Sequence, residues 1–224
     1  MMLLAVDTAT TSCSVALLRG RRLLVESVFA GGRTHSRHLM GMIDGLLGQC
    51  GLMAGDIKAI AVTRGPGTFT GLRIGISTVK GLAAAMHVPV VGVSSLAALA
   101  FPLRHYDGPV VSMIDARRGE VYHTCYDHGS YIPDKVVPVQ VSAPDSPALQ
   151  VPPNAILVGS GAALYRDVFK ARFTDIRFAD PAEDVIRAVW AGLLAMDRLE
   201  RDDVDAVDRL VPQYIRKSDA QIQK

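Results

Sequence analysis

The stretch Arg64–Gly75 reads RGPGTFTGLRIG and joins two elements of different hydrophobic period. Before it, Lys58–Thr63 (KAIAVT) is a short apolar run, which is typical of a buried strand. After it, Leu72–His87 carries apolar residues at helical spacing, which predicts an amphipathic helix. A strand, a glycine-rich loop and a helix in this order predict a layered α/β fold.

Two roles fit the glycine-rich loop. Its backbone amides at the start of a helix could hold an anion, with Gly65, Gly67 and Thr68 as candidate contacts of a nucleotide phosphate. Alternatively, Gly67 and Gly71 only permit a tight strand-to-helix turn, with Thr70 as the helix cap. The loop is not a Walker A loop, because no Gly-Lys-Ser/Thr ends it. The residues alone leave both roles open.

Outward from this loop, the two halves of the chain show the same order of elements. The first half reads βββαβαβα, over Met1–Asp7, Cys13–Leu18, Arg22–Phe29, Thr34–Cys50, Lys58–Thr63, Leu72–His87, Val88–Val93 and Ser94–Phe101. The second half lacks one helix and reads βββ–loop–βαβα, over Pro109–Asp115, Glu120–Tyr126, Tyr131–Val137, Ala155–Gly159, a helix ending near Arg172, Ile176–Ala179 and Pro181–Leu199. We therefore expect a duplicated α/β fold whose second half is reduced. We divide it into residues 1–104 and 105–224, and the last segment is a candidate to return to the first half.

The composition is that of a globular protein. Hydrophobic residues make up 49% of the 224 residues and charged residues 21%, which excludes a disordered chain. The net charge of +2 conceals a basic first half. Residues 1–100 hold nine Lys or Arg against four Asp or Glu, whereas residues 101–224 hold fifteen against eighteen. The basic half is either a surface for nucleic-acid phosphates or only a solvated face.

The chain carries no targeting signal that we recognise. Its apolar start has no Lys or Arg before Asp7, which argues against a signal peptide. The uncharged stretch Gly81–Leu103 contains a histidine and two prolines, which favours a helix, a strand and a helix inside a globule over a membrane span. Three cysteines far apart exclude a disulfide framework and fit a reducing compartment. We therefore expect a cytoplasmic protein.

Four segments of the chain resemble the TsaB (YeaZ) family, the first three its signature segments and the last its C-terminal segment. They are Leu4–Leu17 (LAVDTATTSCSVAL), Arg64–Gly75, Asp115–Tyr122 (DARRGEVY) and Leu210–Arg216 (LVPQYIR). The resemblance implies the actin, hexokinase and sugar-kinase fold, which is ribonuclease H-like and agrees with the duplicated order of elements. It also implies a non-catalytic partner subunit, required for threonylcarbamoyl transfer to adenosine in tRNA.

The same resemblance implies the partners. TsaD, a paralogue with the same fold, transfers the threonylcarbamoyl group to adenine, and TsaE is an ATPase of the larger complex. TsaB-like chains bind TsaD as a heterodimer and form a homodimer when alone. We therefore expect tRNA contact that is at most indirect, no membrane association, no enzymatic activity and no cofactor of its own. Weak binding of ATP or ADP with Mg in the complex is the alternative.

Asp7 and Asp115 end the first strands of the two halves. In kinases of this fold, acids at these places position a magnesium–nucleotide complex, so Asp7, Thr8, Thr10 and Asp115 are candidate nucleotide contacts. The turn Asp7-Thr8-Ala9-Thr10 lacks the glycine that lets backbone amides approach phosphates. Alternatively, both acids accept backbone hydrogen bonds and cap the strand-to-turn transitions. A stand-alone ATP-dependent phosphotransferase is the second hypothesis.

The two long helices of the first half are the predicted partner surface. Thr34–Cys50 and Leu72–His87 carry more apolar residues than one sheet face can cover. The resemblance implies that TsaB-like chains meet TsaD through these helices as an α-helical bundle. The predicted interface residues are His35, His38, Leu39, Met42, Ile43, Leu46, Ile76, Val79, Lys80 and Ala83. The alternative is that both helices are buried against their own sheet.

His35 and His38 lie three residues apart and share one helix face, which could be half of a metal site. The metal motif of the paralogue has two histidines four apart, and no further Asp or His clearly completes a set here. A glycoprotease-like metallopeptidase is therefore the least supported hypothesis, and we expect no metal. Neither G-x-S-x-G nor H-E-x-x-H occurs, so we expect no catalytic residues.

Overall fold

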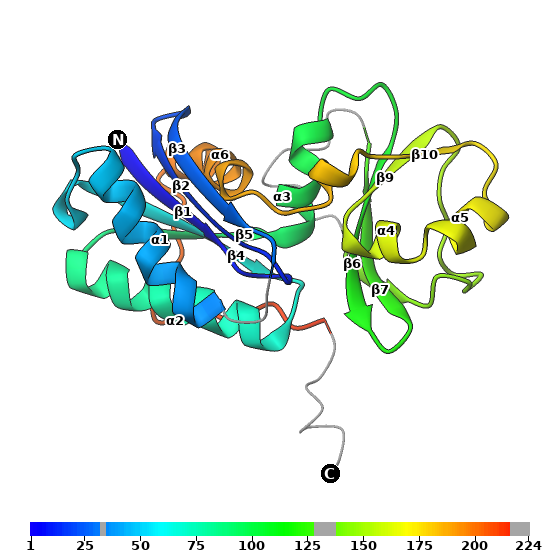
Figure 1. Cartoon of the computed structure of the whole chain (residues 1–224), viewed down its shortest axis with the longest axis horizontal. Helices are drawn as coiled ribbons and strands as arrows, with labels where there is room; N and C mark the ends of the chain where they lie inside the picture. Colours follow the sequence, from blue (N-terminus) through cyan, green and yellow to red (C-terminus); the bar gives the residue numbers. More distant parts are fainter. Residues whose placement is uncertain (32–34, 128–137, 216–224) are drawn as a thin grey trace, which may run out of the picture. The chain divides into compact units, whose positions relative to one another are not determined.

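The computed structural model describes residues 1–31, 35–127 and 138–215, and it divides the chain into two compact units (Figure 1). The first unit consists of Met1–Ala98 and Ile186–Gln213. The second consists of Leu99–Val185 and the described chain from Tyr214 on. The predicted boundary at residues 104/105 differs from this division, and the segment that returns to the first unit is Ile186–Gln213.

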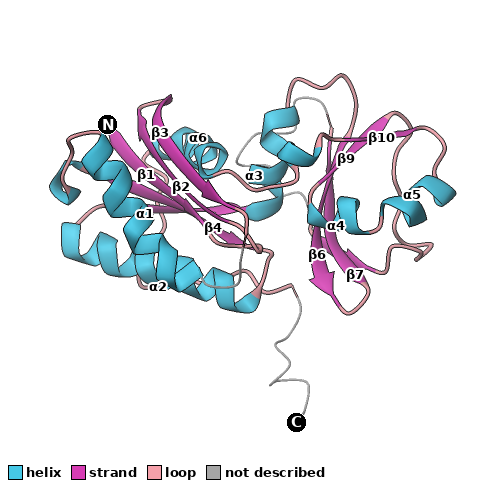
Figure 2. Cartoon of the chain, viewed as in Figure 1, coloured by secondary structure: helices cyan, strands magenta, loops and turns pink. Residues whose placement is uncertain are grey.

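A five-stranded mixed sheet forms the centre of the first unit (Figure 2). The strand order is β3-β2-β1-β4-β5. The first three strands pair antiparallel, whereas β4 runs parallel to β1 and β5 runs parallel to β4. The strands are β1 (Met2–Asp7), β2 (Cys13–Arg19), β3 (Arg22–Phe29), β4 (Ala59–Gly65) and β5 (Val90–Ser94).

Helices cover both faces of this sheet (Figure 1). One face carries α1 (His35–Gln49) and α2 (Phe69–Met86), and the other carries α6 (Ala188–Leu199). A short 3₁₀ helix, η1 (Ala54–Asp56), lies between α1 and β4. All six residues of β1 are buried, as expected for a strand that is covered on both sides.

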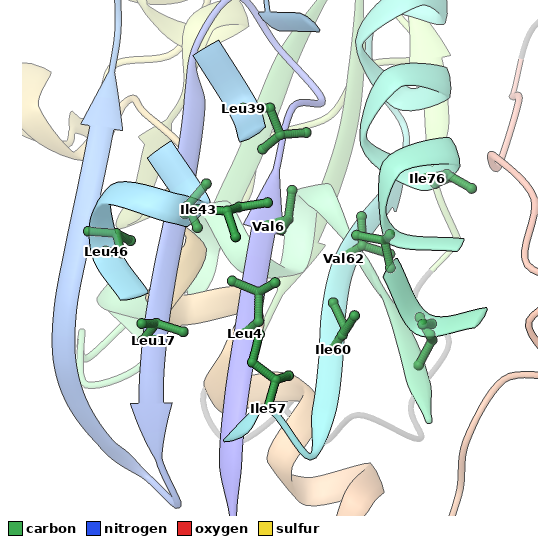
Figure 3. Packing of buried hydrophobic residues seen from close by; sticks show 14 of the residues in the cluster. Leu4, Val6, Leu17, Leu39, Ile43, Leu46, Ile57, Ile60, Val62 and Ile76 are labelled. Atoms are coloured by element: carbon green, nitrogen blue, oxygen red, sulfur yellow. The ribbon is translucent and has the colours of Figure 1, made fainter. Parts of the chain in front are cut away.

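The side chains that alternate toward α1 and α2 form the main core of the first unit (Figure 3). On the sheet these are Leu4, Val6, Leu17, Ile60 and Val62, and on the helices Leu39, Ile43, Leu46 and Ile76. Burying one such side chain stabilises the fold by about 1.5–3 kcal/mol. The cluster therefore fixes both helices on the sheet.

The last long helix differs from its prediction. The range Pro181–Leu199 is not one helix, because Pro181–Glu183 form a 3₁₀ helix (η3) and α6 begins five residues later. This helix packs on the sheet of the first unit and not in the second half. The helix can pack closely on this sheet because the face that it turns to the sheet carries a glycine. A Cβ at Gly192 would lie only 2.8 Å from Leu18 Cδ1.

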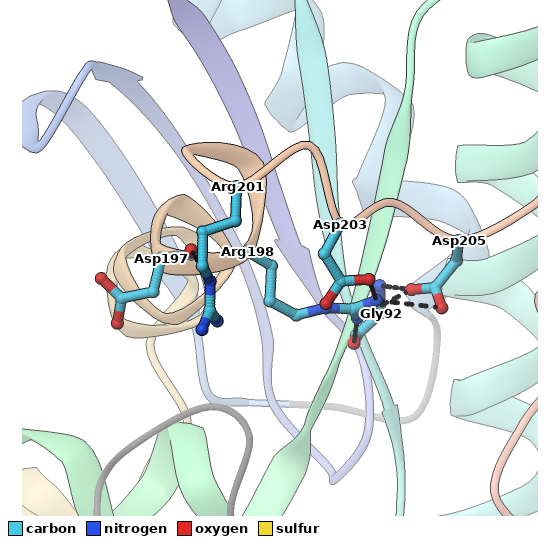
Figure 4. A network of polar contacts seen from close by, with 6 residues as sticks. All are labelled: Gly92, Asp197, Arg198, Arg201, Asp203 and Asp205. Carbon is cyan, nitrogen blue, oxygen red and sulfur yellow. Dashed lines mark hydrogen bonds and ion pairs between the residues drawn. The ribbon is translucent and has the colours of Figure 1, made fainter.

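The returning segment, Ile186–Gln213, covers the outer edge of β5 with hydrogen bonds (Figure 4). Asp205 N donates to Val90 O at 2.9 Å, and Gly92 N donates to Asp205 Oδ2 at 2.7 Å. Arg198, near the end of α6, donates to Gly92 O at 3.1 Å and to Asp205 Oδ2 at 3.0 Å. The same guanidinium pairs with Asp203 at 2.6 Å. An open strand edge is a template for pairing with other chains, and these contacts occupy it.

The second unit repeats the sheet of the first. Its order is β10-β9-β6-β7-β8, in which β6 takes the place of β1, with antiparallel β7 on one side and parallel β9 on the other. The strands are β6 (Val110–Arg117), β7 (Glu120–Tyr126), β8 (Gln140–Ser142), β9 (Ala155–Val158) and β10 (Ile176–Phe178). The predicted strand Tyr131–Val137 lies outside the described residues. The predicted duplication is confirmed, since both sheets have the same order and directions.

The helices of the second unit are short. The predicted helix that ends near Arg172 is interrupted at Tyr165, which separates α4 (Ser160–Leu164) from α5 (Arg166–Arg172). Between the two sheets in the chain lie α3 (Ser95–Ala100) and η2 (Phe101–Leu103). Within the described residues, no helix has the length and apolar character needed to cross a membrane.

Candidate functional site

Asp7, the last residue of β1, is buried (0% exposed) and hydrogen-bonded. Its Oδ1 accepts from Thr63 Oγ1 at 2.6 Å and from Ala9 N at 3.2 Å. Its Oδ2 has no hydrogen-bond partner among the residues that the structure describes. Burial raises the pKa of Asp7 to about 7, and the two hydrogen bonds oppose this rise. The carboxyl therefore connects the end of β1 with β4 and with the turn that follows β1.

The glycine-rich loop packs directly against this turn. Thr68 N donates to Ala9 O at 2.7 Å, and Thr8 Oγ1 donates to Gly71 O at 2.7 Å. A Cβ at Gly67 would overlap Ala9 O, and a Cβ at Gly71 would overlap Thr8 O. Two backbones approach each other here to a distance that only glycine permits. The signature segments Leu4–Leu17 and Arg64–Gly75 are therefore in contact.

The start of α2 is capped within the chain. Thr68 has extended backbone angles, and its Oγ1 accepts from Gly71 N at 3.2 Å, as an N-cap residue does. The predicted cap Thr70 is wrong: the helix begins at Phe69, three residues earlier than predicted, so Thr70 lies inside its first turn.

This arrangement does not fit a magnesium–nucleotide group in the first unit. The Asp7 side chain has no exposed surface through which a magnesium ion or its water could reach it. The turn after β1 covers the backbone of Gly67 and Gly71, which a phosphate would have to approach. Gly65, with φ +127°, is covered by the returning segment, because its Cβ position lies 2.7 Å from Gln213 O. The loop serves contacts within the chain.

Thr10 and Asp115 are the remaining predicted nucleotide contacts. Thr10 Oγ1 lies 2.8 Å from Ser12 Oγ, within the same turn. Asp115 lies in the second unit, where its Oδ1 accepts from Arg117 N at 2.8 Å. Asp7 and Asp115 thus each accept a hydrogen bond from the backbone two residues further on. This is the capping role that the sequence leaves as the alternative.

Most of the predicted interface residues belong to the core of the first unit. The side chains that are at most 4% exposed are Leu39, Ile43, Leu46, Ile76, Val79 and Ala83. They pack against their own sheet, because the apolar stripe of each helix faces it. Met42 is half-buried against the same cluster, and Lys80 Nζ donates to Asp208 O at 3.0 Å and to Leu210 O at 3.3 Å. A partner surface on these helices therefore cannot be formed by these six buried side chains, whereas the exposed His38 stays a candidate.

Among the described residues, the His38 side chain is not part of a group that could hold a metal ion. His38 is exposed, and its ring centroid lies 4.7 Å from that of Phe29. The side chain of His35 lies outside the described residues. No group of three or more His, Cys, Asp or Glu that could hold a metal ion occurs in the described part of the chain.

Sequence reasoning missed the hydroxyl groups that accompany the two aspartates. Thr63 donates to the carboxyl of Asp7, and Ser160 Oγ accepts from Asp115 N at 3.1 Å. Thr63 lies two residues before the end of β4, and Ser160 lies two residues after the end of β9; these strands run parallel to β1 and β6, which carry the acids. A Thr or Ser at this place in both halves is a sequence signal that could have found them.

Comparison of the sequence with known proteins finds a TsaD family model and several TsaB proteins. The family model described as "TsaD: tRNA N6-adenosine threonylcarbamoyltransferase" matches residues 30–224. The tRNA threonylcarbamoyladenosine biosynthesis protein TsaB of Haemophilus influenzae is 35% identical over 228 residues, which cover 96% of this chain and 93% of that protein. TsaB of Bacillus subtilis is 38% identical over 140 residues, which cover 62% of this chain and 61% of that protein. The chain therefore matches less than two thirds of the Bacillus protein.

The solved structure of YeaZ from Pseudomonas aeruginosa is similar over the whole chain. The TM-score is 0.81 at 32% identity, and the match covers 96% of this chain and 99% of that chain. Together with the duplicated sheet order, this likeness confirms the predicted α/β fold of the actin, hexokinase and sugar-kinase class. Because the family model and a relative at 35% identity each match most of its length, the chain belongs to the TsaB (YeaZ) family.

Proposed function

We propose that this chain acts in threonylcarbamoyladenosine biosynthesis on tRNA as the non-catalytic partner of a TsaD-type subunit. The names of the TsaB relatives support the process, and the description of the family model supports the link to a TsaD-type transferase. The position of Asp7 supports a non-catalytic role, because its carboxyl is buried and holds the turn after β1. As part of the same proposal, TsaE joins the larger complex and the chain needs no cofactor of its own.

A row of exposed glycines on α1 carries this proposal. Gly41, Gly45 and Gly48 are exposed, and a Cβ at any of them would meet no atom within 4 Å. A glycine within a helix costs about 0.5–1 kcal/mol relative to alanine. The packing of the chain itself therefore does not require these glycines. We infer that their small size serves close contact with a helix of another chain.

From Ser77 onward, the exposed positions of α2 are also small residues, and this helix packs beside α1 on the same face of the sheet (Figure 1). They are Ser77, Gly81, Ala84 and Ala85. Small side chains on two neighbouring helices permit short distances between helix axes. Met40, which is 49% exposed, adds an adaptable apolar contact beside the glycine row. The same face would hold a TsaD-type subunit or a second copy, so the two complexes exclude each other.

The test is a substitution that fills the glycine row without disturbing the fold. Gly45→Arg places a long side chain on this row, and arginine is a good helix former. Gly45→Ala is the small control, and Gly55→Arg is the matched control in η1, where a Cβ also meets no atom within 4 Å. Sedimentation measures binding to the TsaD-type subunit and self-association, and a reconstituted reaction measures threonylcarbamoyladenosine in tRNA.

We expect Gly45→Arg to weaken both complexes and to lower modification, and both controls to behave like the wild type. Modification by the chain alone, without a TsaD-type subunit, would contradict the non-catalytic role. Unchanged association of Gly45→Arg in both complexes would contradict the proposed surface.

A further inference from the structure

The turn between β6 and β7 has an unusual backbone. Arg117 has φ +63° and Arg118 has φ +56°, and Gly119 follows with φ +77°. Residues other than glycine rarely adopt this left-handed conformation, and Asn or Gly is the usual choice in such a hairpin turn. Here the chain holds two arginines in it. The register shifts between Asp115 and Arg117, which is a bulge that redirects the side chains at the tip.

The side chain of Asp115 binds the first residue of this turn, Arg117. Its Oδ1 accepts from Arg117 N at 2.8 Å, and its Oδ2 lies 3.3 Å from Arg117 Nη1. Its backbone N–H is held by Ser160 Oγ. The Asp115 side chain is 16% exposed, whereas the Arg117 side chain is 66% exposed. Asp115 thus holds the left-handed backbone of Arg117 in place, while the Arg117 guanidinium remains at the surface.

The duplication shows that the fold does not require these arginines. The equivalent connection of the first unit, between β1 and β2, runs over residues 8–12 and carries no charge. Thr8, Ala9 and Ser12 are buried there. In the second unit the same connection is a short tip at which Arg117 and Arg118 are exposed. Because both connections occupy the same place in the same sheet order, the sheet order itself does not require arginines here.

We propose that Arg117 and Arg118 bind the phosphate backbone of RNA, so that tRNA contacts this chain directly. A guanidinium binds phosphate oxygens through two parallel hydrogen bonds, and such contacts position RNA without reading its sequence. This inference rests on the proposed function, whose substrate is tRNA. It replaces the expectation from the sequence that tRNA contact is at most indirect.

The surroundings of the tip favour RNA over an acidic protein. A protein interface is anchored by a few side chains, most often Trp, Tyr and Arg, which lie in well-packed pockets beside other large side chains. The exposed large hydrophobic side chains of the described residues all lie outside β6, β7 and their turn. Contact with a phosphate backbone needs charge and hydrogen-bond donors. The exposed side chains of Arg117 and Arg118 supply both, whereas the flanking acids Asp115 and Glu120 are half-buried.

The test removes the positive charges of Arg117 and Arg118 and keeps the backbone conformation of the turn. The double variant R117N/R118N carries Asn, which tolerates positive φ, so it folds like the wild type. R117K/R118K keeps the charge but loses the bidentate geometry. K170N/R177N removes the same charge from two other exposed positions of the second unit and is the matched control. Each variant is titrated with a fluorescently labelled, unmodified tRNA transcript, with the TsaD-type subunit present and absent, at 50–200 mM salt.

We expect R117N/R118N to bind the transcript about tenfold more weakly, and the slope of log affinity against log salt to fall by about 0.7–0.9 per lost phosphate contact. R117K/R118K should keep the slope and lose part of the affinity, and K170N/R177N should match the wild type. Unchanged affinity and slope in R117N/R118N, or equal losses in the control, would overturn the inference.

The failure of this inference can be told from the failure of the proposed function. If R117N/R118N loses the TsaD-type subunit but keeps its affinity for tRNA, the tip is a protein contact and the inference is wrong. If the wild type binds the transcript through the tip but never binds a TsaD-type subunit, the inference stands and the proposed function fails. A wild type that does not bind the transcript in either state overturns the inference.

Discussion

The hydroxyl of Thr63 donates to Oδ1 of Asp7 over 2.6 Å, between the neighbouring strands β4 and β1. The same oxygen accepts from Ala9 N, whereas Oδ2 has no hydrogen-bond partner among the described residues. A place that kinases of this fold use for a magnesium–nucleotide complex therefore holds a structural carboxyl in this chain. Because ionising Asp7 within the core costs free energy, its effect can be measured as a change of stability with pH.

We predict that the stability of the chain falls with rising pH because of Asp7. Burial raises its pKa from 3.8 to about 7, so between these values the folded state holds a proton that the unfolded state has lost. The contribution of this group to the free energy of unfolding then decreases by about 1.4 kcal/mol per pH unit and levels off above pH 7. Urea denaturation of the wild type and of Asp7→Asn between pH 5 and 8 measures it. The difference between the two should change with pH, and parallel profiles would contradict the prediction.

The same substitution should have opposite effects at two glycines. Gly71→Ala places a Cβ onto the carbonyl of Thr8, so we expect a loss of about 1–3 kcal/mol of stability. Gly45→Ala places a Cβ in open space within α1, so we expect a gain of about 0.5–1 kcal/mol. Thermal unfolding at constant pH compares both variants with the wild type. A gain for Gly71→Ala would contradict its close contact with Thr8, and a loss for Gly45→Ala would contradict the open space around Gly45.

Substitutions at two methionines of α1 distinguish the proposed partner surface from the core. Met42 is half-buried against the core cluster, so Met42→Glu brings a charge toward apolar surroundings and should lower stability. Met40 is 49% exposed, so Met40→Glu should leave stability unchanged. At the centre of a partner surface such a change weakens association by about 2 kcal/mol or more. Sedimentation of Met40→Glu, alone and with a TsaD-type subunit, measures this, and wild-type association would place Met40 outside the surface.

The stability that the covered edge of β5 contributes should depend on Arg198 and Asp205 together. Either side chain replaced by Ala leaves a polar group of Gly92 without its partner, which costs about 1–3 kcal/mol. Since the two side chains also bond each other, the loss in the double variant should be smaller than the sum of the single losses. Urea denaturation of the four proteins in this cycle measures the coupling. The neighbouring exposed Arg201→Ala is the control, and strictly additive losses would contradict the network.

The order of elements followed from local patterns. Short apolar runs predicted the other described strands, but β8 (Gln140–Ser142) lies in a stretch predicted as a loop. Helical spacing of Leu39, Ile43 and Leu46 predicted α1, because this period places apolar side chains on one side of a helix. Helix ends were less predictable. Thr68 and Thr70 are both suitable caps by residue type, and only the backbone angles at Thr68 distinguish them.

The roles of single site residues were harder to predict. Apolar helix residues such as Ile76 and Val79 fit a partner surface and a core equally well in the sequence, and contact with the sheet decides for the core. The glycines of the loop fit phosphate binding and tight packing equally well. The approach of Thr8 and Ala9, residues far from the loop in sequence, decides for packing.

The sequence by itself determined the element order, the duplication and the family of this chain, because these depend on hydrophobic period and on short contiguous motifs. Only the tertiary structure decided that α6 joins the first unit, that Asp7 is buried, and that Gly45 is exposed while Gly71 is enclosed. The physical reason is that a local pattern specifies which side of an element is apolar, whereas burial depends on which distant segment packs against that side.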